Sequence, residues 1–305
     1  SKWVSLGSEL PGLPPERQVV EVDSTLERAF EAVSSEWIAL GRQLGAEPSG
    51  ELSHACACVA NASDFGLMLA WTRLIKDWAA APETILVVCD DPWMFRHLSL
   101  EPGVMAGTKP CLLPRVAQHA LRGFLARAWR ALVLATEALR QRPDQRRSAI
   151  GGPALLVYGH PGSDAVGRDA YFGDLMKSFP RLRRILHVDC PSERARILAG
   201  PTGRTLSLHG WGNPLFALSL VMTRWRPGQK ARRGPYGWLI RRAAALEGGT
   251  AQAMVIGWQN HCQARWVRHT RPTSVLWPWE NHAWERTLVR CLRTNGVRST
   301  GYQHS

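Results

Sequence analysis

A glutamate and a histidine near the end of the chain, Glu280 and His304, are residue types that general acid–base chemistry uses. Each follows a short apolar, β-branched segment typical of a strand, 273–277 before Glu280 and 297–302 before His304. Between these segments, apolar residues recur at the spacing of one helical face from 284 to 292. The pattern predicts a strand–helix–strand unit.

Such a crossover makes its two strands parallel and usually adjacent, so their carboxyl ends meet at one edge of the sheet. Open α/β sheets bind ligands at that edge, and we therefore expect Glu280 and His304 to share a site. A simpler interpretation stays open. In it, Glu280 only complements the dipole of the following helix, and His304 only ends its strand.

Other polar residues follow predicted strands or occupy a polar loop, and they are further candidates for substrate binding: Asp91, His160, Asp169, Tyr171, Asp174 and Asn281. Carboxylates beside an aromatic ring and a glycine suit the binding of sugar hydroxyls, although segment 169–174 also fits a plain loop before a helix. Asp91 precedes Pro92, and an Asp-Pro pair after a strand is more often a turn. No segment has the spacing of a metal site, a P-loop or a dinucleotide fingerprint, so no metal and no cofactor is predicted.

Strands alternate with helices along the whole chain, which predicts an α/β protein with mainly parallel, Rossmann-like sheets flanked by helices. We expect strands at 55–60 and 84–89 and a long helix over 116–141, with Phe124, Leu132 and Leu139 along its apolar side. A basic, proline-containing segment follows that helix. It predicts two α/β units, 1–145 and 150–305, the second ending in the strand–helix–strand unit 274–305.

The chain has 305 residues and a net charge of +13, nearly all of it from arginine. This charge fits a GC-rich genome, or an acidic partner such as nucleotide phosphates, an anionic glycan or acidic lipid headgroups. Nucleic acid is an unlikely partner, because no zinc-finger spacing, RNA-binding aromatic motif or basic heptad region is present. Seven cysteines, several of them in apolar runs, and the lack of a long apolar run favour a cytoplasmic protein, with peripheral attachment to the inner membrane as an alternative.

The string Trp-Pro-Trp-Glu-Asn-His-Ala-Trp-Glu at 277–285, followed by Gly-Tyr-Gln-His-Ser at 301–305, resembles a signature of bacterial surface-carbohydrate (capsule and lipopolysaccharide) biosynthesis proteins. Segments 90–98 and 168–175 agree with this resemblance. It extends to the N-terminal half of GT-B-type glycosyltransferases and, more distantly, to polymerases that transfer glycerol phosphate.

The resemblance implies transfer of a sugar, or a sugar-like phosphate unit, from a nucleotide-activated donor to a glycan or lipid-linked glycan acceptor. His304 would be the general base, and Glu280 would orient it or bind the acceptor. Donor contacts would come mostly from a second half, expected beyond Ser305. The alternative is a non-catalytic glycan-binding or assembly protein with the same fold.

Overall fold

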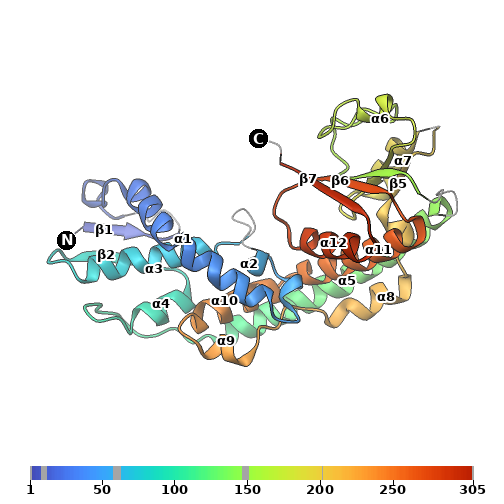
Figure 1. Ribbon diagram of the computed structural model, residues 1–305. Coiled ribbons are helices and arrows are strands. Elements are labelled where there is room, and N and C mark those ends of the chain that lie inside the picture. Colours follow the sequence, from blue (N-terminus) through green and yellow to red (C-terminus); the bar gives the residue numbers. More distant parts are fainter. Residues whose placement is uncertain (1, 8–11, 58–62, 146–150, 201, 304–305) are drawn as a thin grey trace. The chain divides into compact units, whose positions relative to one another are not determined.

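The computed structural model describes residues 2–7, 12–57, 63–145, 151–200 and 202–303. The chain forms two compact units, and it crosses between them more than once (Figure 1). Unit 1 contains 1–122 and 225–249, and unit 2 contains 123–224 and 250–305. This division differs from the expected boundary near 145–150, because most of the long helix α5 (Leu113–Gln145) belongs to unit 2 and a later segment returns to unit 1.

Unit 1 is mainly helical. Its helices are α1 (Val22–Gly45), α2 (His54–Ala57), α3 (Phe65–Ala79), α4 (Pro92–Leu98), α9 (Gln229–Arg233) and α10 (Gly237–Gly248), with 3-10 turns η1 (Pro15–Arg17) and η2 (Gly50–Leu52). Strands β1 (Lys2–Ser5) and β2 (Ile85–Val88) pair in parallel. The buried residues of α1, among them Val33, Trp37 and Leu44, have helical spacing and pack with those of α3 in one core.

Two predictions for unit 1 were wrong in detail. The expected strand over 55–60 begins instead as helix α2, and 58–62 lie outside the described residues. Strand β2 forms where it was expected but is not fully buried, since Leu86 is 51% exposed. With two strands, the described part of unit 1 does not form a Rossmann-like sheet.

Unit 2 contains a five-stranded sheet in the order β5-β4-β3-β6-β7, with every pairing parallel. Its strands are β3 (Pro153–Val157), β4 (Arg183–Leu186), β5 (Thr205–Ser207), β6 (Ser274–Pro278) and β7 (Arg298–Tyr302). Its other elements are α6 (Leu175–Ser178), α7 (Ser192–Ala199), η3 (Leu208–Trp211), α8 (Pro214–Ser219), η4 (Leu220–Met222), α11 (Gln252–Thr270) and α12 (Ala283–Thr294). If β3 is numbered 1 and the later strands follow in chain order, the sheet has the order 3-2-1-4-5, which is that of Rossmann-like sheets.

Both faces of this sheet are covered by helices, as parallel sheets require. Successive strand residues point to opposite faces. Ala154 and Leu156 of β3 join a core with α5, α11 and α12, while Leu155 and Val157 join a second core with α6 and α7. The expectation of an α/β fold with a parallel sheet flanked by helices is therefore confirmed for this unit.

The predicted strand–helix–strand unit at the end of the chain is confirmed. Strands β6 and β7 are adjacent and parallel, with Leu276 paired to Thr300. Between them, α12 buries Trp284, Leu288 and Leu292 against the sheet. The helix ends before Gly296, whose φ of +70° is a conformation that glycine adopts without strain.

Helix α5 forms over the predicted range, but its expected apolar side does not face the core. Phe124, Leu132 and Leu139 are exposed, whereas Ala131, Leu134 and Ala138 are buried. The helix is apolar on two opposite sides, so its periodicity alone did not identify the buried one. Among the residues that the structure describes, no helix is both long and apolar enough to span a membrane.

Candidate functional site at the carboxyl edge of the sheet

The order of the strands marks one position on the unit 2 sheet. From β3 the chain builds outward through β4 to β5, and it then returns to add β6 and β7 on the other side of β3. Strands β3 and β6 are therefore neighbours whose connections run in opposite directions. In open α/β sheets, ligands bind outside the carboxyl ends of two such strands.

Five polar side chains follow the carboxyl ends of three neighbouring strands at this position: Tyr158 after β3, His187 and Asp189 after β4, and Glu280 and His282 after β6. The Tyr158 ring centre lies 4.8 Å from that of His187 and 6.4 Å from that of His282. Side chains from positions far apart in the sequence thus meet around one phenol.

The site contains two imidazole–carboxylate pairs. Nε2 of His282 lies 3.0 Å from Oε2 of Glu280, and Nδ1 of His187 lies 3.1 Å from Oδ2 of Asp189. An imidazole oriented by a carboxylate can accept or release a proton near neutral pH. The arrangement therefore has the parts that acid–base chemistry needs.

The turn after β6 places the first of these pairs. Asn281 has a left-handed φ of +61°, and its Oδ1 accepts a hydrogen bond of 2.7 Å from Nε1 of Trp279. Glu285 in the first turn of α12 reaches back, and its Oε1 accepts from the Glu280 backbone N–H at 3.0 Å. Gly301 of β7 leaves room for the Trp279 ring, because a Cβ there would lie 2.8 Å from Cε3 of Trp279.

Burial and neighbouring charge shift several pKa values at this edge. Burial, and then the charges of Glu280, Glu285 and Asp189, raise the pKa of Tyr158 far above its ordinary value, with a weak opposing effect of the Trp284 indole. Burial, and then Glu280, also raise the pKa of Tyr171. Burial raises the pKa of Glu285. Both phenols therefore stay protonated and can donate hydrogen bonds.

The pKa of Asp189 moves the other way. Burial alone would raise it, but the hydrogen bond and charge of His187, with help from Arg130 and His282, lower it. Asp189 therefore stays ionised beside the His187 imidazole. With the two phenols, it offers both acceptors and donors of hydrogen bonds, as a ligand with several hydroxyls requires.

Four buried polar atoms at the site have no well-aligned hydrogen-bond partner among the described residues: Oη of Tyr158, Nε2 of His187, Nε1 of Trp284 and Oε2 of Glu285. An unpaired buried polar group costs about 1–3 kcal/mol. Similar atoms lie elsewhere, for example on Trp37 and Gln263, but these four lie at the switch point of the sheet, where a polar ligand or water can supply the missing bonds.

Of the residues predicted from sequence, His160 and Tyr171 also lie at this edge. The Tyr171 ring centre is 6.1 Å from that of Tyr158 and 5.9 Å from that of His160. The Gly159–Gly162 turn that carries His160 is held by Arg194, whose Nη2 donates to the His160 carbonyl at 2.7 Å. This arginine stabilises the loop instead of facing a ligand.

Asp169 and Asp174 have local roles. The Asp169 carboxylate is buried, and its Oδ1 accepts the backbone N–H of Tyr171 at 3.0 Å, so it shapes the loop that presents Tyr171. Asp174 is exposed and pairs with Lys177 at 2.8 Å. Among the described residues, neither carboxylate forms a hydrogen bond or ion pair with the side chains of Tyr158, His187 or His282.

Asp91 lies in unit 1 and not at this edge. Its Oδ1 accepts the backbone N–H groups of Trp93 and Met94, both at 3.0 Å, so it caps α4. His304 lies outside the described residues, and its pairing with Glu280 stays a prediction. His209, at the end of β5, has both ring nitrogens bonded, to the Val188 carbonyl and the Trp258 indole, and burial lowers its pKa to about 4.

Sequence reasoning missed Tyr158, His187, Asp189, His282 and Glu285. The signal for His187 was present, because His187 directly follows Leu186, the last residue of β4, where the strand-end rule looks for site residues. His282 stands two positions after Glu280, in the segment already singled out. Within the described ranges, no three His, Cys, Asp or Glu side chains converge as a metal ion would require.

Comparisons of this chain with protein-family models, with curated proteins and with solved structures gave no match.

Proposed function

We propose that this protein is a glycosyltransferase-like enzyme, of GT-B type, that acts in surface-polysaccharide assembly. It transfers a sugar, or a sugar-like phosphate unit, from a nucleotide-activated donor to a hydroxyl of a glycan or lipid-linked glycan acceptor. The observation that supports this most is the Glu280–His282 pair at the switch point, with a 3.0 Å separation between Oε2 and Nε2. The pair falls inside the string that resembles surface-carbohydrate biosynthesis proteins.

With a sugar donor, the acceptor oxygen forms a bond to the anomeric carbon, the bond from that carbon to the phosphate oxygen breaks, and the nucleotide leaves with the electron pair. With CDP-glycerol, the acceptor oxygen forms a bond to the phosphorus that carries the glycerol unit, the bond from that phosphorus to the bridging oxygen breaks, and CMP leaves with the electron pair. The acceptor hydroxyl loses its proton to an imidazole. His282 is the base that the described residues offer, with His304 as the sequence-based candidate, and Glu280 stabilises the imidazolium that forms.

The mixture of hydrogen-bond donors and acceptors at the edge supports a role in holding the acceptor. Tyr158, Tyr171 and the two carboxylate–imidazole pairs supply both kinds of group, as a sugar ring with several hydroxyls requires. In this proposal the donor phosphates bind away from these carboxylates.

The test is transfer from a panel of nucleotide sugars and CDP-glycerol, with release of the nucleotide as the readout. His282→Ala and Glu280→Gln should lower kcat by about 10²–10⁴-fold, the usual share of acid–base catalysis. Stability in urea should change by less than about 0.5 kcal/mol. His304→Ala, assayed in parallel, identifies which imidazole takes the proton.

The matched controls are Glu193→Gln on α7 and His269→Gln on α11, both exposed and outside the site. They should transfer at the wild-type rate. Near-normal turnover of His282→Ala and of His304→Ala would exclude both histidines as the base. Saturable glycan binding without transfer, lost in Glu280→Gln, would instead establish the non-catalytic glycan-binding alternative.

A further inference from the structure

Helix α5 carries an apolar face on the side opposite to the core. Leu125, Trp129, Leu132 and Leu139 are each more than half exposed, and Trp129 is 70% exposed. Their spacing of four, three and seven residues keeps them on one side of the helix. Single exposed apolar residues are ordinary, but a continuous row that includes a tryptophan indicates an interaction surface.

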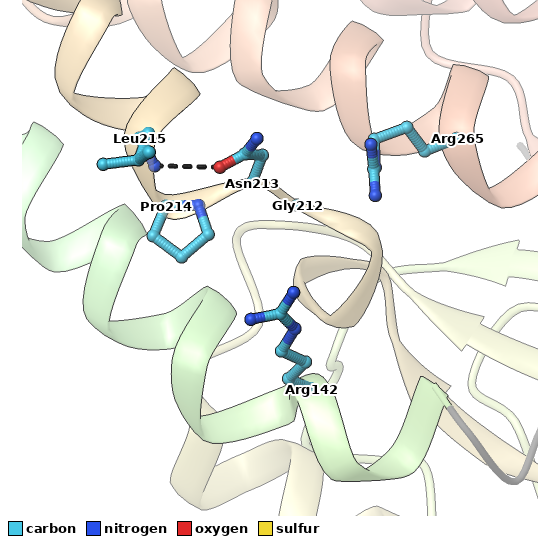
Figure 2. Close-up of a pocket in the computed structure, with 6 residues that line it drawn as sticks. All are labelled: Arg142, Gly212, Asn213, Pro214, Leu215 and Arg265. Carbon is cyan, nitrogen blue, oxygen red and sulfur yellow. Dashed lines mark hydrogen bonds between the residues drawn. The ribbon is translucent and has the colours of Figure 1, made fainter.

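A second apolar face lies on the neighbouring segment α8–η4. Leu215, Leu218 and Met222 follow one another at helical spacing, and all are exposed. This segment runs beside α5: Nε of Arg127 donates to the Val221 carbonyl at 2.8 Å, and Arg142 and Leu215 line the same pocket (Figure 2). We call the four exposed residues of α5, Leu125, Trp129, Leu132 and Leu139, all in unit 2, the outer face.

Arginines border the outer face. Between 125 and 142, α5 carries Arg127, Arg130, Arg140 and Arg142 against one acidic residue, Glu137. Arg127 is buried and internally bonded, whereas Arg140 and Arg142 are exposed at the end where α8 begins. Segment 214–222 contains no charged residue. The surface is therefore apolar with a basic border.

The pocket at this border has a volume of about 270 Å³ and two arginines in its wall, Arg142 and Arg265. Figure 2 shows both guanidinium groups directed into the space beside Asn213. Asn213 uses its Oδ1 to accept the Leu215 backbone N–H at 3.0 Å, which leaves its amide N–H₂ as a donor. Among the side chains that the structure describes, no acidic one lines the pocket, so its chemistry suits a small anion such as a phosphate.

We propose that the outer face is a docking surface for an anionic phospholipid bilayer, with its apolar side chains in the interface and a lipid phosphate in the Arg142–Arg265 pocket. An apolar face with tryptophan and leucine beside a basic border is the pattern of proteins that bind in the plane of a membrane. Tryptophan also favours the headgroup region.

Charge decides between this occupant and a second copy of the chain. Two copies joined through the outer face would bring like basic borders together, within a protein of net charge +13. An acidic lipid surface instead attracts the same charges, and each basic residue near it strengthens binding by about 1 kcal/mol.

The test is co-sedimentation of the full chain with vesicles of phosphatidylcholine alone and of an equal mixture of phosphatidylcholine and phosphatidylglycerol. The wild type should bind the mixed vesicles and release in high salt. Arg142→Gln removes one basic residue from the surface. Because about 1 kcal/mol corresponds to roughly a fivefold change in affinity, the variant should bind the mixed vesicles about fivefold more weakly. Trp129→Ser should weaken binding by at least as much.

Matched controls are Arg293→Gln on α12 and Ile197→Ser on α7, which are exposed but lie off the outer face. They should bind the mixed vesicles like the wild type. Equal binding to both vesicle types, or full binding by Trp129→Ser, would overturn the proposal. A concentration-dependent dimer that Trp129→Ser and Arg142→Gln dissociate would also overturn the proposal. Binding of free glycerol phosphate without any binding to vesicles would overturn it as well. None of these readouts depends on transferase activity.

Discussion

Two clusters of buried polar groups, one in each unit, differ in how far their hydrogen bonds are satisfied. In unit 1, Arg242 uses Nη1 and Nη2 on the two oxygens of Asp64, at 2.9 and 2.7 Å, and Nε on Asp91. Around Tyr158 in unit 2, four buried polar atoms have no well-aligned partner among the described residues. The first cluster is complete without a ligand, and the second is not.

This contrast is not simply one unit against the other. Arg184, fully buried beneath the unit 2 sheet, donates to Thr205 and to the carbonyls of Asp164, Arg168 and Leu198. A protein that satisfies a buried arginine so fully can also satisfy a tyrosine hydroxyl. Buried polar atoms without a well-aligned partner also occur elsewhere, for example on Trp37, Trp225 and Gln263, so those around Tyr158 mark a site only together with their position at the switch point of the sheet.

The largest expected difference in stability comes from the complete cluster. Arg242→Met removes the partner of Asp64 and Asp91, and breaking a buried ion pair typically costs about 3–5 kcal/mol. The loss should fall toward the low end of that range, because the Asp64 side chain is 44% exposed. Urea unfolding of the variant is the measurement.

The control for that variant is Arg233→Met, an exposed arginine in α9 of the same unit. It should change the free energy of unfolding by less than about 0.5 kcal/mol. If Arg242→Met also left the free energy of unfolding unchanged, the hydrogen bonds from Arg242 to Asp64 and Asp91 would not stabilise the fold. The comparison between a complete and an incomplete cluster would then fail.

The sequence carried much of the information about the unit 2 sheet, because the signals there are local. Alternating apolar strands, the helical spacing of Trp284 and Leu288, and the stop at Gly296 together predict β6, α12 and β7. The rule that ligands bind at strand ends then places Glu280 at the correct edge.

Features that depend on contacts distant in sequence were not predictable in the same way. The return of 225–249 to unit 1 has no local signature, and the buried side of α5 is set by what packs on it, because Leu132 and Leu134 are equally apolar. Tyr158 and His187 became site residues only through the strand order, which juxtaposes the ends of β3, β4 and β6.

A second, smaller difference should appear with pH. Burial, partly offset by hydrogen bonds from Ala55 and Ser53, raises the pKa of Glu247 in unit 1 to about 7. A carboxyl whose folded pKa lies above its unfolded value contributes stability that is fully present below about pH 4.5 and lost as pH rises through about 7. With one pKa unit worth about 1.4 kcal/mol, the loss of stability is on the order of 3 kcal/mol.

Glu247→Gln isolates this effect, because Gln keeps an oxygen to accept from Ser53 and Ala55 but does not titrate. The free energy of unfolding of the variant, relative to the wild type, should rise by about 3 kcal/mol between acid and mildly basic pH. If the difference between variant and wild type did not change with pH, burial would not raise the pKa of Glu247 in the folded protein.

The smallest effect, and the one of opposite sign, is expected at the incomplete cluster. Tyr158→Phe removes an unpaired buried hydroxyl while keeping the ring that contacts His187 at 4.8 Å. Because an unsatisfied buried polar group costs about 1–3 kcal/mol, the variant should be neutral or more stable by about 1 kcal/mol, measured by urea unfolding without ligand. Transfer activity should fall in the same protein, since the phenol would no longer donate to the acceptor. Destabilisation instead of stabilisation would mean that the hydroxyl has a structural partner, and the contrast between the two clusters would then not mark the site.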